Sequence, residues 1–307
     1  MKGFQISASY TGLLGAGLAF AGAVMFSAKA VFVKLAYQSG IDPLSLLMMR
    51  MLISLPFFLG IALYSRKRKG ATRLKTPELV QLIAVGMLGY YLASWLDFVG
   101  LQYITASLER LVLFVYPTMV VVLASLVFRR PIRREYYLAL LITYLGIALA
   151  FADKLDWGSQ KALWIGALWV FGAAFAYACF LIGSEKLIPK VGAVRFTANA
   201  LTASCAGVIL HQLIAIQGLG LEGWPTQVYV LAACIALFST VIPSFLFSKS
   251  IGFIGASKAA IIGSVGPVST ILLAWHFLNE HISLFQILGT ALVLVGVGII
   301  SLSAKKG

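Results

Sequence analysis

Long apolar runs follow one another along this chain of 307 residues. Most are about 20 residues long, which as an α-helix spans the hydrocarbon core of a bilayer. Short segments carrying charged residues, Gly and Pro separate them. The alternation of polar and apolar residues that a transmembrane barrel needs is absent from the runs. The pattern therefore predicts an all-α integral membrane protein.

The runs predict ten transmembrane helices, because a helix satisfies its own backbone hydrogen bonds in lipid. The expected spans are residues 12–36, 44–64, 79–101, 105–128, 136–152, 162–184, 197–216, 228–248, 257–277 and 283–302. Composition supports this class, since 61% of the residues are hydrophobic and 11% are charged.

Two stretches of the chain repeat each other, with equivalent residues 150 positions apart. Identical residues at this spacing include Ile104 and Ile254, Ser107 and Ser257, Pro117 and Pro267, and Gly146 and Gly296. Duplication of a helix bundle is the economical explanation. We expect one repeat in residues 1–154, containing spans one to five, and a second in residues 160–304, containing spans six to ten.

The distribution of charge predicts the orientation in the membrane. Basic residues fill the connections after spans two and four: Arg66, Lys67, Arg68, Lys69, Arg73, Lys75, Arg129, Arg130, Arg133 and Arg134. Acidic residues gather in the opposite connections: Asp42, Asp153, Asp156, Glu222 and Glu280. Both termini are therefore expected in the cytoplasm. The net charge of +14 follows from this asymmetry and argues for contact with anionic lipid headgroups, not with nucleic acid.

An odd number of spans per repeat requires the second repeat to insert upside down relative to the first. Two inverted five-helix repeats are typical of secondary transporters, which expose a central site alternately to each side of the membrane. A duplicated scaffold without transport is the alternative.

Specific residues of both repeats resemble a known family. The residues on which the resemblance rests are Tyr116, Pro117 and Gly146 in the first half, and Gly266, Pro267, Ala274, Asn279, Glu280, His281, Ile282, Leu288, Gly289, Val295 and Gly296 in the second. Together they resemble the EamA-type transporters of the drug/metabolite transporter superfamily. The resemblance implies ten helices, cytoplasmic termini, a substrate cavity lined by spans one to four and six to nine, and peripheral spans five and ten. Many members carry a basic residue at the positions of Lys34 and Arg50, and often an acidic residue where this chain has Arg130.

Charged residues within the spans lie mainly in the first half. Counting from the outer turns at about 1.5 Å per residue places Lys34, Asp97 and Glu109 at a similar depth, near 9 Å. With Arg110 they are expected to form a charge-balanced cluster. The cluster is either a buried ion network that fixes packing or an outer gate whose carboxylates titrate during proton coupling.

Lys29 and Arg50 are expected about 15 Å inward, close to the bilayer centre, without an acidic residue at that depth. Two unpaired cations there are unfavourable unless water or an anionic group completes the site. A substrate carboxylate or phosphate is the predicted partner, and Arg offers a fork suited to bidentate binding. The alternatives are snorkelling of these side chains or a neutral Lys29.

Aromatic and helix-breaking residues complete the candidate site. Tyr91 and Trp95 share a helix face and are expected to line the cavity, whereas Trp169 and the other aromatic residues of span six are expected to pack. Pro117 and Pro267, the latter with Gly263 and Gly266, are expected to form hinges or static kinks. His211 is expected to stand alone in its span.

We therefore expect a secondary transporter that exports a small organic metabolite, which is an amino-acid-like compound or an organic anion or zwitterion. A multidrug efflux carrier of the same fold is the main alternative, and a channel or a membrane-embedded enzyme is weaker. The sequence has no P-loop and no metal-ligand spacing, so no catalytic role, cofactor or metal is expected. The expected location is a cell inner (plasma) membrane, as a monomer or homodimer.

Overall fold

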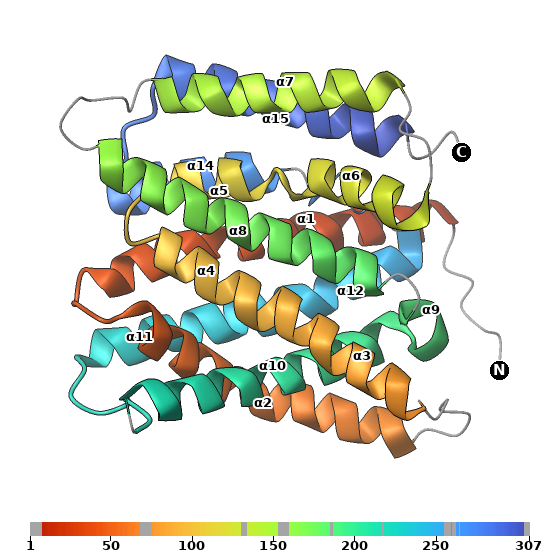
Figure 1. Ribbon diagram of the computed structural model, residues 1–307, viewed down its shortest axis with the longest axis vertical. Helices are drawn as coiled ribbons and strands as arrows, with labels where there is room; N and C mark the ends of the chain where they lie inside the picture. Colours follow the sequence, from red (N-terminus) through yellow and green to blue (C-terminus); the bar gives the residue numbers. More distant parts are fainter. Residues whose placement is uncertain are drawn as a thin grey trace.

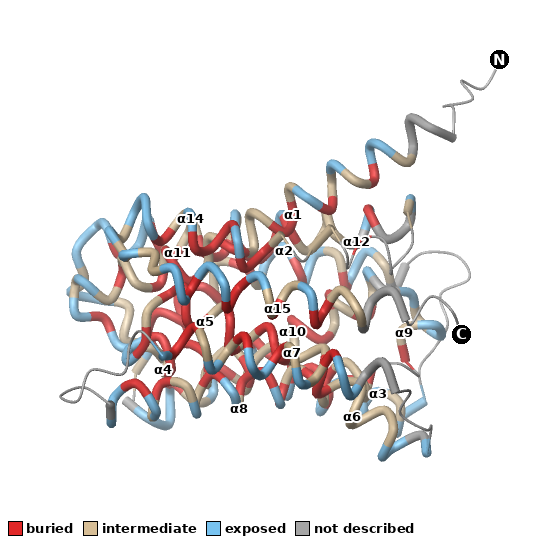
Figure 2. The backbone as a smooth tube through the Cα atoms, turned by 90° about the horizontal axis from the view of Figure 1, so that it is seen from above, coloured by how far each residue is buried: buried red, intermediate tan, exposed pale blue. Residues whose placement is uncertain are grey.

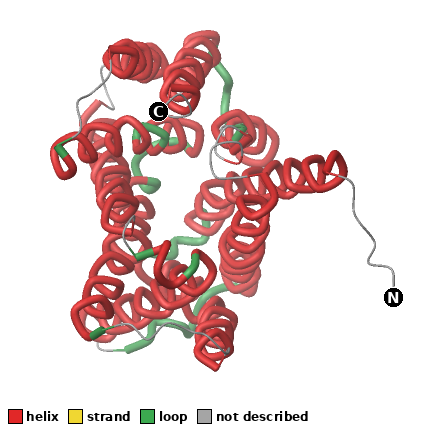
Figure 3. Tube along the Cα trace, turned by 90° about the vertical axis from the view of Figure 1, so that its right-hand side faces the viewer, coloured by secondary structure: helices red, strands yellow, loops and turns green. Residues whose placement is uncertain are grey.

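The computed structural model describes residues 8–67, 75–129, 134–152, 160–184, 187–216, 218–254, 259, 262–263 and 265–303. These residues form helices joined by short turns and contain no strand (Figure 3). The all-helical prediction is thus confirmed for the part of the chain that the structure describes.

The first half supplies seven α-helices and one π-helix. They are α1 (Ala8–Tyr37), α2 (Pro43–Lys67), α3 (Thr76–Gly86), η1 (Met87–Leu92), α4 (Ala93–Gly100), α5 (Ala106–Leu113), α6 (Tyr116–Phe128) and α7 (Arg134–Ala152). The second half supplies α8 (Gln160–Ser184), α9 (Ile188–Val191), α10 (Ala193–Ile216), α11 (Thr226–Ala236), η2 (Leu237–Val241), α12 (Ile242–Ile254), α14 (Gly266–Leu278) and α15 (Leu284–Ser303).

Seven stretches of the described chain are long and apolar enough to cross a membrane. They are Gly12–Tyr37, Pro43–Ser65, Thr76–Gly100, Ala106–Val127, Lys161–Ser184, Val194–Ala215 and Thr226–Phe247. Three shorter apolar helices, Tyr137–Ala152, Gly266–Leu278 and Leu284–Ile299, lie where spans five, nine and ten were predicted. The protein is therefore a multi-pass membrane protein, and the count of ten spans stays a prediction.

Three of the long spans are interrupted in their middle. Residues Met87–Leu92 and Leu237–Val241 are π-helical, so each of these spans contains a wider turn. The fourth span breaks after Leu113 and resumes at Tyr116, with Pro117 in the first turn of α6. Proline is tolerated there because the first turn of a helix has no internal acceptor for its missing N–H.

Helices of the two halves alternate in the bundle (Figure 1). The most extensive contacts pair α7 with α15, α1 with α12, α2 with α10 and α4 with α8, and each pair joins one half to the other. Buried residues line the faces where these helices meet, and exposed residues cover the outside (Figure 2). The interior is thus built jointly by both halves.

The pair α7 and α15 lies along one edge of the bundle and packs through glycines (Figure 1). A Cβ atom on Gly146 would lie 2.6 Å from the carbonyl oxygen of Gly289. A Cβ atom on Gly296 would lie 2.8 Å from the carbonyl oxygen of Ala139. Such close approach of two backbones is the usual role of small residues between membrane helices.

Gly296→Ala should lower the thermal denaturation temperature, because its methyl group meets backbone of α7 and forces the two helices apart. Overpacking of this kind costs about 1–3 kcal/mol. Gly298→Ala on the same helix is the matched control, since a Cβ atom there has nothing within 4 Å. Equal melting of both variants in detergent would contradict this account of the α7–α15 contact.

Candidate functional site

Arg50 lies in the interior of the bundle on α2 and is only 6% exposed. Its Nε donates to Thr240 Oγ1 at 3.0 Å, and its Nη1 donates to Ser94 Oγ at 3.4 Å. The guanidinium carbon lies 5.6 Å from the centre of the Phe98 ring. No carboxylate of the described residues forms an ion pair with it. Arg50 is therefore a buried cation that donates to two neutral hydroxyl groups, lies near an aromatic ring, and interacts electrostatically with Asp97 without forming an ion pair.

The π-helical turn of η2 places the hydroxyl that Arg50 contacts. Thr240 donates its hydroxyl hydrogen to the carbonyl of Ile235, five residues earlier, at 2.9 Å. That bond leaves the lone pairs of Thr240 Oγ1 free to accept from Arg50 Nε. Single π-helical turns within membrane helices often occur at functional sites. Each of the two π-helical spans therefore supplies one hydroxyl to Arg50, since Ser94 lies in α4 two residues after the end of η1.

Lys29 of α1 joins two buried carboxylates. Its Nζ lies 2.5 Å from Asp97 Oδ2 and 3.4 Å from Glu109 Oε1. The side chain of Lys29 is 15% exposed, whereas those of Asp97 and Glu109 are 3% and 0% exposed. The two carboxyl groups also interact with each other. We name Lys29, Asp97 and Glu109 the ion cluster.

Each carboxyl group of the ion cluster keeps one oxygen without a hydrogen-bond donor among the described residues, Asp97 Oδ1 and Glu109 Oε2. Arg110 lies beside the cluster and interacts electrostatically with both carboxylates. Its hydrogen bonds go elsewhere, from Nε to Thr270 Oγ1 at 3.1 Å and from Nη2 to the carbonyl of Phe26 at 2.9 Å. Arg110 therefore ties α5 to α14 and α1 while partly neutralising the carboxylates.

The expected partners of the two lysines are wrong. Lys29 was expected to lack an acidic partner, yet it binds Asp97 and Glu109. Lys34 was expected in the cluster, yet its Nζ donates to the carbonyl of Leu101 at 3.0 Å. The depth count took the turns near Gly40 and Tyr103 to lie at the same level, whereas the contacts of Lys29 with Asp97 and of Lys34 with Leu101 show that they do not. Five residues of α1 separate the two lysines, about 7.5 Å along the helix.

An aromatic group joins three helices near Arg50. Tyr91 Oη and His211 Nδ1 are hydrogen bonded at 2.9 Å. The Trp95 ring meets the His211 ring edge to face at 5.4 Å and the Trp169 ring at 5.9 Å. His211 was expected to stand alone and Trp169 only to pack. Their contacts join the span formed by η1 and α4 to α8 and α10, so no local sequence pattern predicts them.

Three of the four residues expected as hinges lie in the first turn of a helix. Gly266 and Pro267 open α14, and the carbonyl of Gly266 accepts from Ser27 Oγ at 3.0 Å. Gly263 faces the ring of Phe247, and Pro117 follows the break before α6. Their role as hinges stays a prediction.

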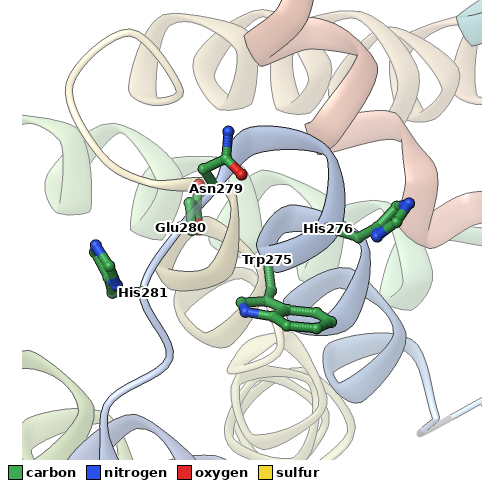
Figure 4. Close-up of a pocket in the computed structure, with 5 residues that line it drawn as sticks. All are labelled: Trp275, His276, Asn279, Glu280 and His281. Atoms are coloured by element: carbon green, nitrogen blue, oxygen red, sulfur yellow. The ribbon is translucent and has the colours of Figure 1, made fainter.

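A cavity of about 260 Å³ lies at the end of α14, lined by Trp275, His276, Asn279, Glu280 and His281. The side chains of Trp275, His276 and His281 point in different directions (Figure 4). In the described part of the chain, no three His, Cys, Asp or Glu side chains come together as metal ligands would. This cavity is therefore an opening beside Glu280 rather than a set of converging ligands.

Comparison with known proteins places the chain in a family. The model of the EamA-like transporter family matches residues 13–152 and again residues 164–302. A relative from Bacillus subtilis, named as the uncharacterized transporter YcbK, is 32% identical over 87% of this chain and 86% of its own length. An uncharacterized transporter from Synechocystis is 25% identical over 83% of this chain and 78% of its own length.

A solved crystal structure shares the fold. It superposes with a TM-score of 0.65 over 98% of this chain and 99% of its own chain, at 18% identity. The two family matches together cover nearly the whole chain and coincide with its apolar helices. The chain belongs to the EamA-like transporter family.

Proposed function

We propose that this transporter carries a small organic anion or zwitterion, such as an amino-acid-like metabolite, out of the cell by alternating access. The observation that carries the proposal is the buried guanidinium of Arg50, which forms no ion pair among the described residues and only interacts at longer range with Asp97. A buried charge is costly unless it is paired. An anionic group of the substrate would pair it, and a guanidinium fits a carboxylate through two parallel hydrogen bonds.

Recurring local geometry supports two inverted repeats. The π-helical turns begin at Met87 and Leu237, and the left-handed residues that end α6 and α14 are Arg129 and Asn279. Both pairs have the 150-residue spacing of the sequence repeat. Inverted repeats allow two mirror-related conformations that open the same site to opposite sides. On the charge distribution, both termini lie in the cytoplasm and the turn near Tyr103 lies outside.

The ion cluster is the proposed proton-binding site. It places two carboxyl groups against one ammonium group in a nearly dry environment. A proton held between Asp97 Oδ1 and Glu109 Oε2 would satisfy both oxygens and remove the repulsion between the two carboxylates. Release of that proton to one side of the membrane would couple transport to the proton gradient.

Efflux of toxic aromatic compounds is the second candidate. The edge-to-face group of Tyr91, Trp95, Trp169 and His211 favours it, because aromatic side chains offer contact area for planar apolar ligands. Arg50 would then contribute only to the packing of the bundle.

A metabolite panel followed by a flux assay tests the proposal. Compounds that bind the folded protein raise its melting temperature by mass action. We expect organic acids or amino acids to produce this shift, and vesicles preloaded with such a compound to accumulate its labelled form by saturable counterflow. Shifts by uncharged aromatic compounds alone would favour the second candidate. A single-channel conductance, or chemical conversion of the compound, would contradict a carrier.

A further inference from the structure

Glu280 caps a helix of the other half of the chain. Its Oε1 accepts from the backbone N–H of Ala106 at 2.8 Å. Its Oε2 accepts from the backbone N–H of Ser107 at 3.2 Å and from Ser107 Oγ at 2.6 Å. Ala106 and Ser107 are the first two residues of α5, whose N–H groups have no acceptor within the helix. We name these three hydrogen bonds the Glu280 cap.

The Glu280 cap joins α14 to α5 at the end of the bundle where α5 begins. Asn279, with φ of 52°, ends α14 in the left-handed conformation and turns the chain so that Glu280 lies at that end (Figure 4). Ser107 is 1% exposed. A carboxylate at a helix N-terminus is favoured by the helix dipole as well as by the hydrogen bonds. The contact is therefore a strong bridge between the two halves.

The repeat does not reproduce this bridge at its opposite end. The sequence equivalents of Ala106 and Ser107 are Ala256 and Ser257, so the small residue and the hydroxyl recur. The equivalent of Glu280 is Arg130. These three equivalents lie outside the described residues, and the comparison rests on their sequence. A guanidinium has no acceptor, and the positive end of a helix repels it.

We propose that the Glu280 cap holds the outer end of the transporter closed and makes the inward-open conformation its resting state. The proposal rests on the proposed alternating access, in which the outer ends of spans four and nine separate when the site opens outward. That separation breaks all three hydrogen bonds of the cap. In sequence, the equivalent of Glu280 in the first repeat is Arg130, so that position supplies no carboxylate to oppose opening at the cytoplasmic end. The two conformations are therefore unequal in free energy although the repeats are alike.

A distance measurement across the cap tests this proposal. Spin labels at Gln102→Cys and His281→Cys, both exposed positions flanking the cap, are introduced after Cys179, Cys205 and Cys234 are replaced by serine. In lipid nanodiscs we expect one dominant short distance when Glu280 is present. Glu280→Ala should increase the population of longer distances at least about tenfold, since it removes hydrogen bonds to a charged group. Glu280→Gln keeps one acceptor oxygen and should give a smaller increase.

Two further variants sharpen the test. Glu222→Ala removes another exposed carboxylate from the same side of the bundle and should leave the distances unchanged. Arg130→Glu supplies a carboxylate at the opposite end and should itself raise the population of longer outer distances. The proposal is overturned if Glu280→Ala, or Glu280→Gln where the alanine variant does not fold, gives the same distances as the parent. Because the readout needs no substrate, a failure of the transport assay alone leaves this result interpretable.

Discussion

Replacing Arg50 with glutamine should weaken binding of the anionic substrate by at least about 30-fold, because loss of one partner from a buried, hydrogen-bonded charge pair costs about 2–5 kcal/mol. The same change removes a buried cation that forms no ion pair among the described residues. The substrate-free protein should therefore melt at the same temperature or higher. Isothermal titration and thermal denaturation of one purified variant measure both effects.

The controls for Arg50 separate charge from hydrogen bonding. Ser94→Ala removes the weaker hydroxyl partner and keeps the guanidinium, so binding should change little. Arg50→Lys keeps the charge but loses the planar fork, and should bind more weakly than the parent protein. Unchanged affinity for the anion in Arg50→Gln would show that another group binds it.

Lys29→Met should lower the stability of the folded protein, which is the opposite of the effect expected for Arg50→Gln. It leaves Asp97 and Glu109 buried without their ammonium partner, and breaking a buried ion pair in this way costs about 3–5 kcal/mol. The melting temperature of the purified protein should fall clearly.

Adding Asp97→Asn to Lys29→Met should restore most of that loss, because the double change removes one positive and one negative charge together. Single and double variants form a cycle that isolates the interaction of the two side chains. A stable Lys29→Met protein that no longer responds to a proton gradient would instead assign the ion cluster to coupling alone.

These two expected results have opposite signs, although the sequence suggests the same environment for both cations. Hydropathy located the long spans within a few residues, since lipid imposes the length of each apolar run. The sequence also marked Pro117 and Pro267 as interruptions of their spans, and each lies in the first turn of a helix, α6 and α14 respectively. The side-chain contacts that the sequence did not predict depend on how the helices rotate and tilt against one another.

Lys29 shows the limit of the sequence most clearly. Its pairing with Asp97 joins residues 68 positions apart, and a shift of α1 by five residues, about 7.5 Å, would bring Lys34 to that depth instead. His211 lies 120 positions from its partner Tyr91. Contacts between residues so far apart in the chain leave no periodic pattern in the sequence.

The alternation of helices from the two halves affects how the protein is made. During synthesis, α1, α2 and α4 enter the membrane before α12, α10 and α8, the helices that they contact most extensively, have been translated. Until those partners are inserted, the faces of the early helices that are buried in the finished protein must contact lipid or the insertion machinery. A product that ends near residue 154 would lack these contacts, and Arg50 would lose its hydrogen bond to Thr240.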